Sequence, residues 1–233
     1  MPSSGTENPA RSWRTLPSRY LLEAFSRTEL GLPEQGFVFC CFNNNYKILP
    51  PVFDVWMRLL QAVPGSVLWL LEDNPAVSTH LRREAQLRGV AAERLVFAPR
   101  MPTADHLARH RMADLFLDTL PVNAHTTASD ALWAGLPVLT CMGRSFAARV
   151  AASLLHTVGL PELVTETAQD YEALAIALAR DPARLQALRD KLHAQKASSP
   201  LFNARQAARD IEAAYLAMHR RHTQGLGPDV IEV

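Results

Sequence analysis

Short apolar runs alternate with longer amphipathic segments through most of the chain. Each run ends at a glycine, a proline or a polar cluster, which is typical of strands buried on both faces of a parallel sheet. We expect such strands at residues 37–42, 66–71, 95–98, 115–117, 138–140 and 163–164. Strands that alternate with helical segments in this way predict an α/β fold, with a Rossmann-like parallel sheet and helices on both faces.

The segments between the runs carry apolar residues at helical spacing. The first of them opens with Pro50 and Pro51 and places Val52, Val55 and Trp56 on one face. We expect helices over residues 50–62, 77–88, 103–110, 125–134 and 145–158. After residue 168 the pattern changes to helix only, with amphipathic C-terminal helices at 169–180, 182–196 and 203–221.

The two ends of the chain lack these patterns. Residues 1–33 are rich in Ser, Thr, Pro and Arg, with one short apolar knot at 20–22, and are predicted to form a linker or partly disordered segment. Residues 34–222 form the predicted lobe. The tail, 223–233, holds two glycines and a proline and is predicted to be flexible.

Composition excludes several classes of function. The 24 basic and 23 acidic residues give a net charge of +1, so the chain has no general attraction to nucleic acid or to anionic membranes. The three cysteines make neither a disulfide framework nor a zinc spacing, which favours a reducing cytoplasmic location. The N-terminal segment has no apolar core like that of a signal peptide, and no run approaches the length of a membrane span.

Polar clusters follow three of the predicted strands, at residues 43–47, 100–109 and 118–130. Ligands of open parallel sheets bind beyond the carboxyl ends of the strands, so these clusters are expected to share one site. The third cluster contains His125, Thr126 and Thr127, which we place in the first turn of a helix. Free backbone N–H groups and the helix dipole favour an anion there, and we expect a phosphate or diphosphate. The alternative is that the threonines only cap the helix.

Several motifs together carry a family resemblance. They are Phe42-Asn-Asn-Asn-Tyr-Lys47-Ile, the segment around His106 and Arg109, Ala113-Asp-x-x-Leu-Asp-Thr119, Asn123-x-His-Thr-Thr127, Asp130-x-Leu-Trp-x-Gly135, Arg149-Val-Ala-Ala-Ser153 and Ser198-Ser-Pro-Leu-Phe-Asn203. In this order and spacing, over residues 26–221, they resemble the C-terminal catalytic lobe of the O-linked N-acetylglucosamine (O-GlcNAc) transferase family. Members of that family have a GT-B architecture of two Rossmann-like lobes, usually preceded by tetratricopeptide repeats. They transfer GlcNAc from UDP-GlcNAc to Ser or Thr of proteins.

The resemblance implies roles for residues at the phosphate end of the donor. His125, Thr126 and Thr127 are expected to hold the diphosphate and the sugar. Lys47 is the expected catalytic residue, which stabilises negative charge on the departing UDP. Asn44 stands where the family commonly has a Gln that contacts phosphate, so its reach is shorter.

The resemblance also implies contacts to the nucleoside. Asp130 is expected to bind the ribose hydroxyls, His106 to stack on uracil, Arg109 to help fix the base and Met101 to offer backbone contacts. Thr103 replaces a Lys that commonly contacts the ribose, and Arg100 is a candidate to compensate.

Each of these side chains also has a purely structural interpretation. Lys47 could be a solvated loop lysine, His106 a surface residue, and Asp130 a partner of the helix dipole. No Asp-x-Asp motif is present to hold a metal ion, so Lys47 and the helix N-terminus are expected to act without a metal or other cofactor.

The sequence predicts only one lobe of a two-lobe enzyme. The chain could therefore be part of a longer transferase, half of a split enzyme, or a UDP-sugar-binding module without turnover. A nucleotide-regulated interaction module is a further alternative. UDP-GlcNAc and UDP are the expected small-molecule partners, and a protein acceptor would be bound through a lobe or repeats outside this sequence. We expect no transfer by the chain alone, and we expect the helix at 203–221 to pack across the lobe junction.

Overall fold

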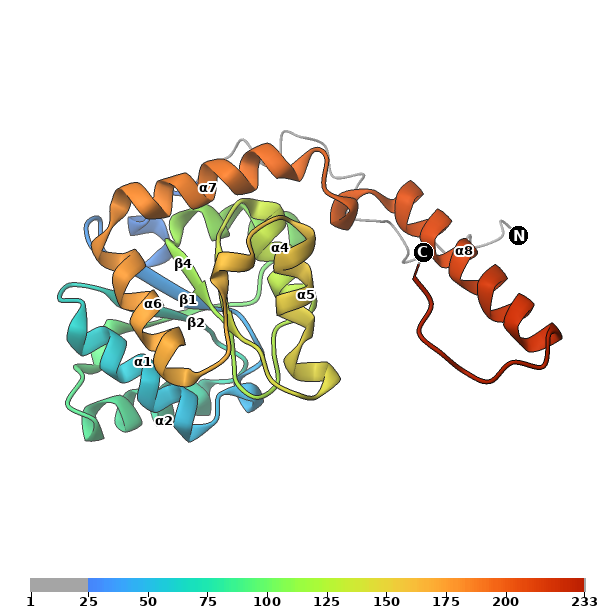
Figure 1. Ribbon diagram of the computed structural model, residues 1–233. Coiled ribbons are helices and arrows are strands. Elements are labelled where there is room, and N and C mark those ends of the chain that lie inside the picture. Colours follow the sequence, from blue (N-terminus) through green and yellow to red (C-terminus); the bar gives the residue numbers. More distant parts are fainter. Residues whose placement is uncertain (1–24, 233) are drawn as a thin grey trace, which may run out of the picture.

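The computed structural model describes residues 25–232, which form a six-stranded parallel sheet with helices around it (Figure 1). The strands are β1 (Val38–Cys41), β2 (Val67–Leu71), β3 (Leu95–Ala98), β4 (Leu115–Leu117), β5 (Val138–Cys141) and β6 (Val164–Thr165). Their order in the sheet is β3-β2-β1-β4-β5-β6, and every neighbouring pair is parallel. The predicted Rossmann-like α/β class is confirmed.

The central strands form the core because apolar side chains cover both of their faces. Every residue of β1, β2, β4 and β5 is buried. Cys40 of β1 stands in register with Trp69 of β2 on one side and with Phe116 of β4 on the other. The chain order therefore reverses between β1 and β4, the place where open parallel sheets bind their ligands.

Helices flank the sheet on both sides. They are α1 (Pro50–Ala62), α2 (Pro75–Leu87), α3 (Thr103–Arg109), α4 (Thr126–Ala134), α5 (Val150–Thr157), α6 (Ala168–Arg180), α7 (Pro182–Lys196) and α8 (Ala204–Thr223). Helix α1 packs against α6, while α4 packs against α3 and α5. Figure 1 shows α1, α2 and α6 on one side of the sheet and α4 and α5 on the other.

Most helices lie within one or two residues of their predicted bounds, and two of the differences have a clear physical cause. Helix α2 begins at Pro75 instead of residue 77, because the side chain of Asn74 caps it by accepting a hydrogen bond from Val77 N at 3.2 Å. The predicted helix at 145–158 is split into the 3₁₀ turn η7 (Phe146–Ala148) and α5. The carbonyls of Ala147 and Ala148 accept hydrogen bonds from Asn123 and Gly143 instead of from a following helical turn.

The described residues before position 34 pack onto the lobe. Leu32 is buried in the core, and Arg27 pairs with the Asp114 carboxylate at 2.8 Å while donating to the Gly36 carbonyl, also at 2.8 Å. Arg189 on α7 reaches the other oxygen of Asp114 at 3.0 Å. The apolar knot at residues 20–22 lies outside the described residues.

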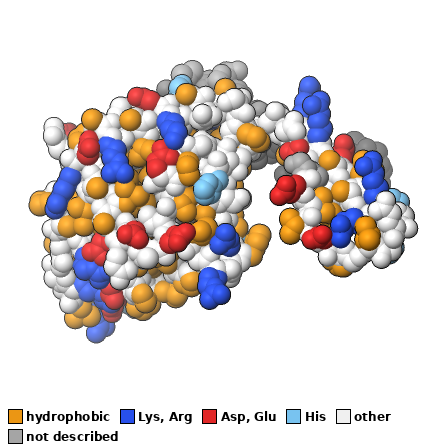
Figure 2. Space-filling view, viewed as in Figure 1, with side chains coloured by type: hydrophobic (Ala, Val, Ile, Leu, Met, Phe, Trp, Pro, Cys, Tyr) orange, Lys and Arg blue, Asp and Glu red, His pale blue; other side chains and the backbone are white. Residues whose placement is uncertain are grey.

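Helix α8 projects away from the lobe (Figure 1) and contains no buried residue. Ile211, Tyr215, Leu216 and Met218 each expose more than half of their surface. The space-filling view shows hydrophobic side chains on this separate part of the molecule (Figure 2). Its packing across a lobe junction stays a prediction. Within residues 25–232, no helix is both long and apolar enough to cross a membrane.

Candidate functional site

A cleft of about 280 Å³ lies at the carboxyl ends of the central strands. Its lining includes seven of the residues that the sequence predicted for the site, namely Asn44, Met101, Thr103, His106, Arg109, Thr127 and Asp130. Phe42, Leu71 and Arg100 complete the wall. Residues far apart in the sequence thus meet where the three polar clusters were expected to converge.

Arg109 is buried and His106 is half-buried, and the two side chains form one bonded unit in this cleft. The Arg109 guanidinium lies 4.3 Å from the Phe42 ring centre and donates to the Pro99 carbonyl at 2.6 Å. Its other terminal nitrogen is 2.6 Å from His106 Nδ1, and since arginine only donates, Nδ1 must accept. Burial, and secondarily the charge of Arg109, lowers the pKa of His106 to about 4. His106 is therefore a neutral ring at physiological pH, and it is not the solvated surface residue of the alternative interpretation.

Arg100 is a cation that lines the same cleft as the substituted position, Thr103. Its guanidinium donates to Asn44 Oδ1 at 3.4 Å and pairs with the carboxylate of Asp73. Thr103, at the start of α3, lines the same cleft. Arg100 thus stands beside the place where a lysine was expected from the family resemblance.

The start of α4 forms the opposite end of the site. The sequence pattern placed His125 in the first turn of this helix, and the structure corrects that placement. His125 is the N-cap residue, and the helix begins at Thr126. The His125 side chain makes no capping hydrogen bond, and its Nε2 is buried without a partner among the described residues. Its ring centre is 6.1 Å from that of Phe146. The backbone N–H groups of the first helical turn lack partners within the helix, so this end is suited to an anion.

Lys47 lies next to this helix end but does not line the cleft. It closes η4 (Asn45–Lys47), the short turn that follows β1. Its ammonium donates to the Asn123 carbonyl at 2.9 Å, so it is not a freely solvated lysine. Because Asn123 lies two residues before the N-cap, this bond keeps the amine beside the start of α4.

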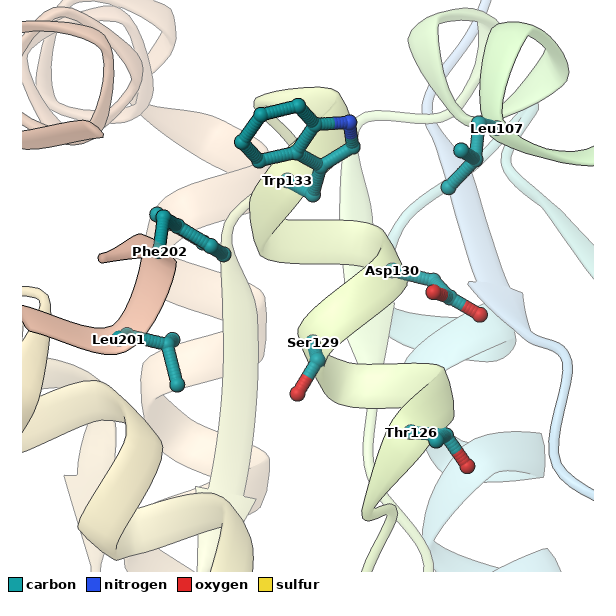
Figure 3. A pocket seen from close by; sticks show the side chains of 7 residues that line it. All are labelled: Leu107, Thr126, Ser129, Asp130, Trp133, Leu201 and Phe202. Atoms are coloured by element: carbon teal, nitrogen blue, oxygen red, sulfur yellow. The ribbon is translucent and has the colours of Figure 1, made fainter. Parts of the chain in front are cut away.

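Asp130 separates the cleft from a second cavity. That cavity, of about 160 Å³, lies along α4 and is lined by Leu107, Thr126, Ser129, Asp130, Trp133, Leu201 and Phe202 (Figure 3). Thr126 therefore lines this cavity and not the cleft. Burial raises the pKa of Asp130 to about 6, and none of the described residues forms a hydrogen bond or ion pair with its carboxylate.

A buried polar network behind the cleft was missing from the residues predicted for the site. The Thr127 hydroxyl donates to Asn43 Oδ1, and Asn43 Nδ2 donates to Thr119 Oγ1 at 2.7 Å. Asp118 lies 3.5 Å from the same amide nitrogen and is fully buried. Its position at the end of an apolar run was the available signal, since a carboxylate there is rarely buried without a purpose.

No group of three or more His, Cys, Asp or Glu side chains within residues 25–232 is arranged to hold a metal ion. Whether the site works without a metal stays a prediction.

Comparison with known proteins gives a consistent result. The model of glycosyl transferase family 41 matches residues 3–211. A UDP-N-acetylglucosamine–peptide N-acetylglucosaminyltransferase of Caenorhabditis elegans is 37% identical over 228 residues, which cover 98% of this chain and 20% of that protein. The probable enzyme SEC of Arabidopsis thaliana is 36% identical over 208 residues, 89% of this chain and 21% of that protein. This chain thus spans about a fifth of the length of these relatives.

Solved structures agree. An O-GlcNAc transferase of Thermobaculum terrenum superposes with a TM-score of 0.77 at 38% identity, covering 82% of this chain and 37% of that one. A sucrose-phosphate synthase of Thermosynechococcus elongatus, at 20% identity and a TM-score of 0.59, shares the fold over 84% of this chain and 48% of its own. With the sheet order, the cleft and the motifs that line it, these matches lead to one conclusion: the chain belongs to glycosyl transferase family 41.

Proposed function

We propose that the cleft binds UDP-GlcNAc and that this chain is the donor-binding lobe of a protein O-GlcNAc transferase. One observation carries the proposal: seven residues with expected nucleotide contacts line a single cleft beside the N-terminus of α4. The names of the relatives in worm and plant agree with that donor and with transfer to a polypeptide.

The nucleoside fits the part of the cleft that His106, Asp130 and Arg100 line. A neutral His106 ring, tilted against Phe42 and bonded to Arg109, offers a flat surface on which uracil can stack. Asp130 is an unpaired carboxylate on the same wall and can accept both ribose hydroxyls. Arg100 supplies a positive charge near Asn44 that offsets the absence of a lysine at position 103.

The diphosphate fits the start of α4. The backbone N–H groups of the first turn of α4 are donors already in place when an anion binds, and His125 and Thr126 lie at the same helix end. When the glycosidic bond breaks, its electron pair moves to the β-phosphate oxygen and the charge on UDP grows. Lys47 stands beside this position and can transfer its hydrogen bond from Asn123 to that oxygen, which favours the transition state over the bound donor.

The test is calorimetric titration of the 233-residue chain with UDP, in the presence and in the absence of EDTA. We expect binding in both conditions and much weaker binding of uridine, because uridine lacks the charge that α4 attracts. Asp130→Ala should weaken binding, whereas Glu34→Gln, a change at an exposed carboxylate outside the cleft, should not. Binding that requires Mg²⁺ or Mn²⁺ would refute metal independence, and absence of UDP binding would refute the proposed function.

The alternative is a UDP-sugar-binding or interaction module without turnover. The exposed apolar stripe of α8 favours a role in contacting another protein surface under either proposal. Hydrolysis or transfer of GlcNAc by an assembled two-lobe form, and its loss in Lys47→Ala, would separate the two. We place either activity in the cytoplasm, because Cys40, Cys41 and Cys141 are all buried free thiols.

A further inference from the structure

Asp118 is a buried carboxylate for which the proposed mechanism gives no role. It follows β4 directly, and none of its surface is exposed. Its Oδ1 accepts hydrogen bonds from Thr119 N at 2.8 Å and from Ala124 N at 2.6 Å, and its Oδ2 accepts one from Thr140 Oγ1 at 2.6 Å. A carboxylate without a salt bridge in the core costs stability, so its retention calls for a functional reason.

The hydrogen bond from Ala124 N connects Asp118 with two parts of the proposed phosphate site, the start of α4 and the Lys47 ammonium. It closes the loop 118–124 into a ring whose last residue precedes the N-cap His125. The residue on the other side of Ala124 is Asn123, whose carbonyl receives the Lys47 ammonium. A shift of Ala124 would therefore displace Lys47 and the start of α4 together.

A second connection runs through Asn43. Thr119 Oγ1 donates to the Val122 carbonyl at 2.7 Å, so it must accept the hydrogen bond from Asn43 Nδ2. The Asn43 amide is thereby oriented with its oxygen toward Thr127, whose hydroxyl donates to it. Asp118 lies at the origin of this connection, beside Thr119 and within 3.5 Å of Asn43 Nδ2.

We propose that Asp118 is the positioning residue of the donor site, which holds Lys47, His125 and Thr127 in one arrangement through the loop 118–124 and Asn43. This role rests on the proposed function. Asp118 contacts no substrate in it; the residue acts only through the groups that do.

The titratable groups around Asp118 lead to a measurable effect, the uptake of protons when UDP binds. Burial raises its pKa to about 7, and the hydrogen bonds from Thr140, Ala124 and Thr119 and the charge of Lys47 oppose that rise. The other titratable groups that face it are Cys41 on β1, Cys141 on β5 and Tyr171 on α6, and burial raises the pKa of each of the three. Lys47 is therefore the neighbouring charge. An anionic diphosphate beside Lys47 would raise the pKa of Asp118 further, so UDP binding near pH 7 should take up a fraction of a proton.

The experiment compares Asp118→Asn with Thr140→Val in the full chain. Asn keeps the shape of Asp118 but removes the charge that strengthens its bonds to Thr119 and Ala124. Thr140→Val removes a bond to the same carboxylate on the oxygen that faces away from the donor site. We expect Asp118→Asn to weaken UDP binding about tenfold, which corresponds to about 1.4 kcal/mol, and Thr140→Val to change it less than threefold.

Two further measurements separate positioning from general destabilisation. Calorimetry in buffers of different ionisation enthalpy should show less proton uptake on UDP binding in Asp118→Asn than in the wild type and in Thr140→Val. Hydrogen exchange of the ligand-free chain should accelerate at residues 119–127 in Asp118→Asn alone. The positioning role would be overturned if Asp118→Asn matched the wild type in UDP affinity, in proton uptake on binding and in hydrogen exchange at residues 119–127. That result would leave the proposed function intact. Failure of the wild-type chain to bind UDP would overturn both.

Discussion

Asp130 allows a prediction in which stability and ligand binding change in opposite directions. Its carboxylate is half-buried, has no partner among the described residues, and has a pKa raised by burial from 3.8 to about 6. The fold therefore prefers the protonated form. The corresponding stability is fully present below pH 3.8 and is lost as the pH rises through about 6. Replacing the carboxylate by a neutral amide should remove this loss of folding stability at high pH.

The magnitude follows from the pKa difference. Two pKa units correspond to roughly 3 kcal/mol at about 1.4 kcal/mol per unit. Because the side chain is partly exposed, water screens much of this effect, and we expect about 1 kcal/mol. Asp130→Asn should thus be more stable than the wild type at pH 8 by about 1 kcal/mol and equally stable at pH 3.5. Its affinity for UDP at pH 8 should fall, because an amide is a poorer acceptor for two ribose hydroxyls.

Urea unfolding at pH 8 and pH 3.5, followed by tryptophan fluorescence, measures the first effect, and calorimetry with UDP measures the second. Glu34→Gln is the control, since it neutralises an exposed carboxylate outside the cleft. If Asp130→Asn were destabilised at pH 8, an unseen partner would have to hold the carboxylate in the fold. If it bound UDP as tightly as the wild type, Asp130 would have no part in the nucleotide site.

Three other changes have defined expectations. Lys47→Ala, in a complete two-lobe transferase, should reduce kcat by roughly a hundredfold or more with a smaller loss of UDP-GlcNAc affinity; a raised KM with normal kcat would instead make Lys47 a ground-state binder. Thr103→Lys should tighten UDP binding by up to about 1–2 kcal/mol in calorimetry, and no change would mean that Arg100 already compensates. Gly36→Ala should destabilise the chain by roughly 2 kcal/mol or more in urea unfolding, because φ is +105° and a Cβ would lie 2.4 Å from the Gly65 carbonyl oxygen; a nearly neutral effect would contradict that close approach.

Periodicity predicted the sheet well because its strands are buried on both faces, which leaves short apolar runs with clear ends. Helices α1 and α7 also begin and end at the predicted residues, and each begins at a proline. The interrupted helix after residue 145 could not be foreseen in this way. Its interruption depends on a hydrogen bond from Asn123 to Ala147, a contact that only the folded loop creates.

The site likewise contains residues that could be predicted from the sequence and others that could not. Residues in polar clusters at strand ends, such as His106 and Asp130, were accessible to prediction because their type and position both indicated a ligand. The orientation of the Asn43 amide was not, because it depends on which neighbours donate and which accept. The burial of Asp118 was signalled only by its position at the end of an apolar run. The neutral state of His106 likewise follows from its burial, and secondarily from the charge of Arg109, neither of which the sequence reveals.

The reversal of strand order between β1 and β4 has a consequence for how the protein comes to be functional. Asn43 and Thr119 are separated by 76 residues in sequence yet form one hydrogen bond, and Lys47 and Asn123 are separated by the same interval. Such contacts close long loops and form late, since their entropy must be lost before they stabilise anything. A nascent chain that ends before β4 would hold β1, β2, β3 and most of the residues that line the cleft, but neither of these two hydrogen bonds. The phosphate end of the site should therefore form in a single step during synthesis, when β4 and the start of α4 join a sheet that already exists.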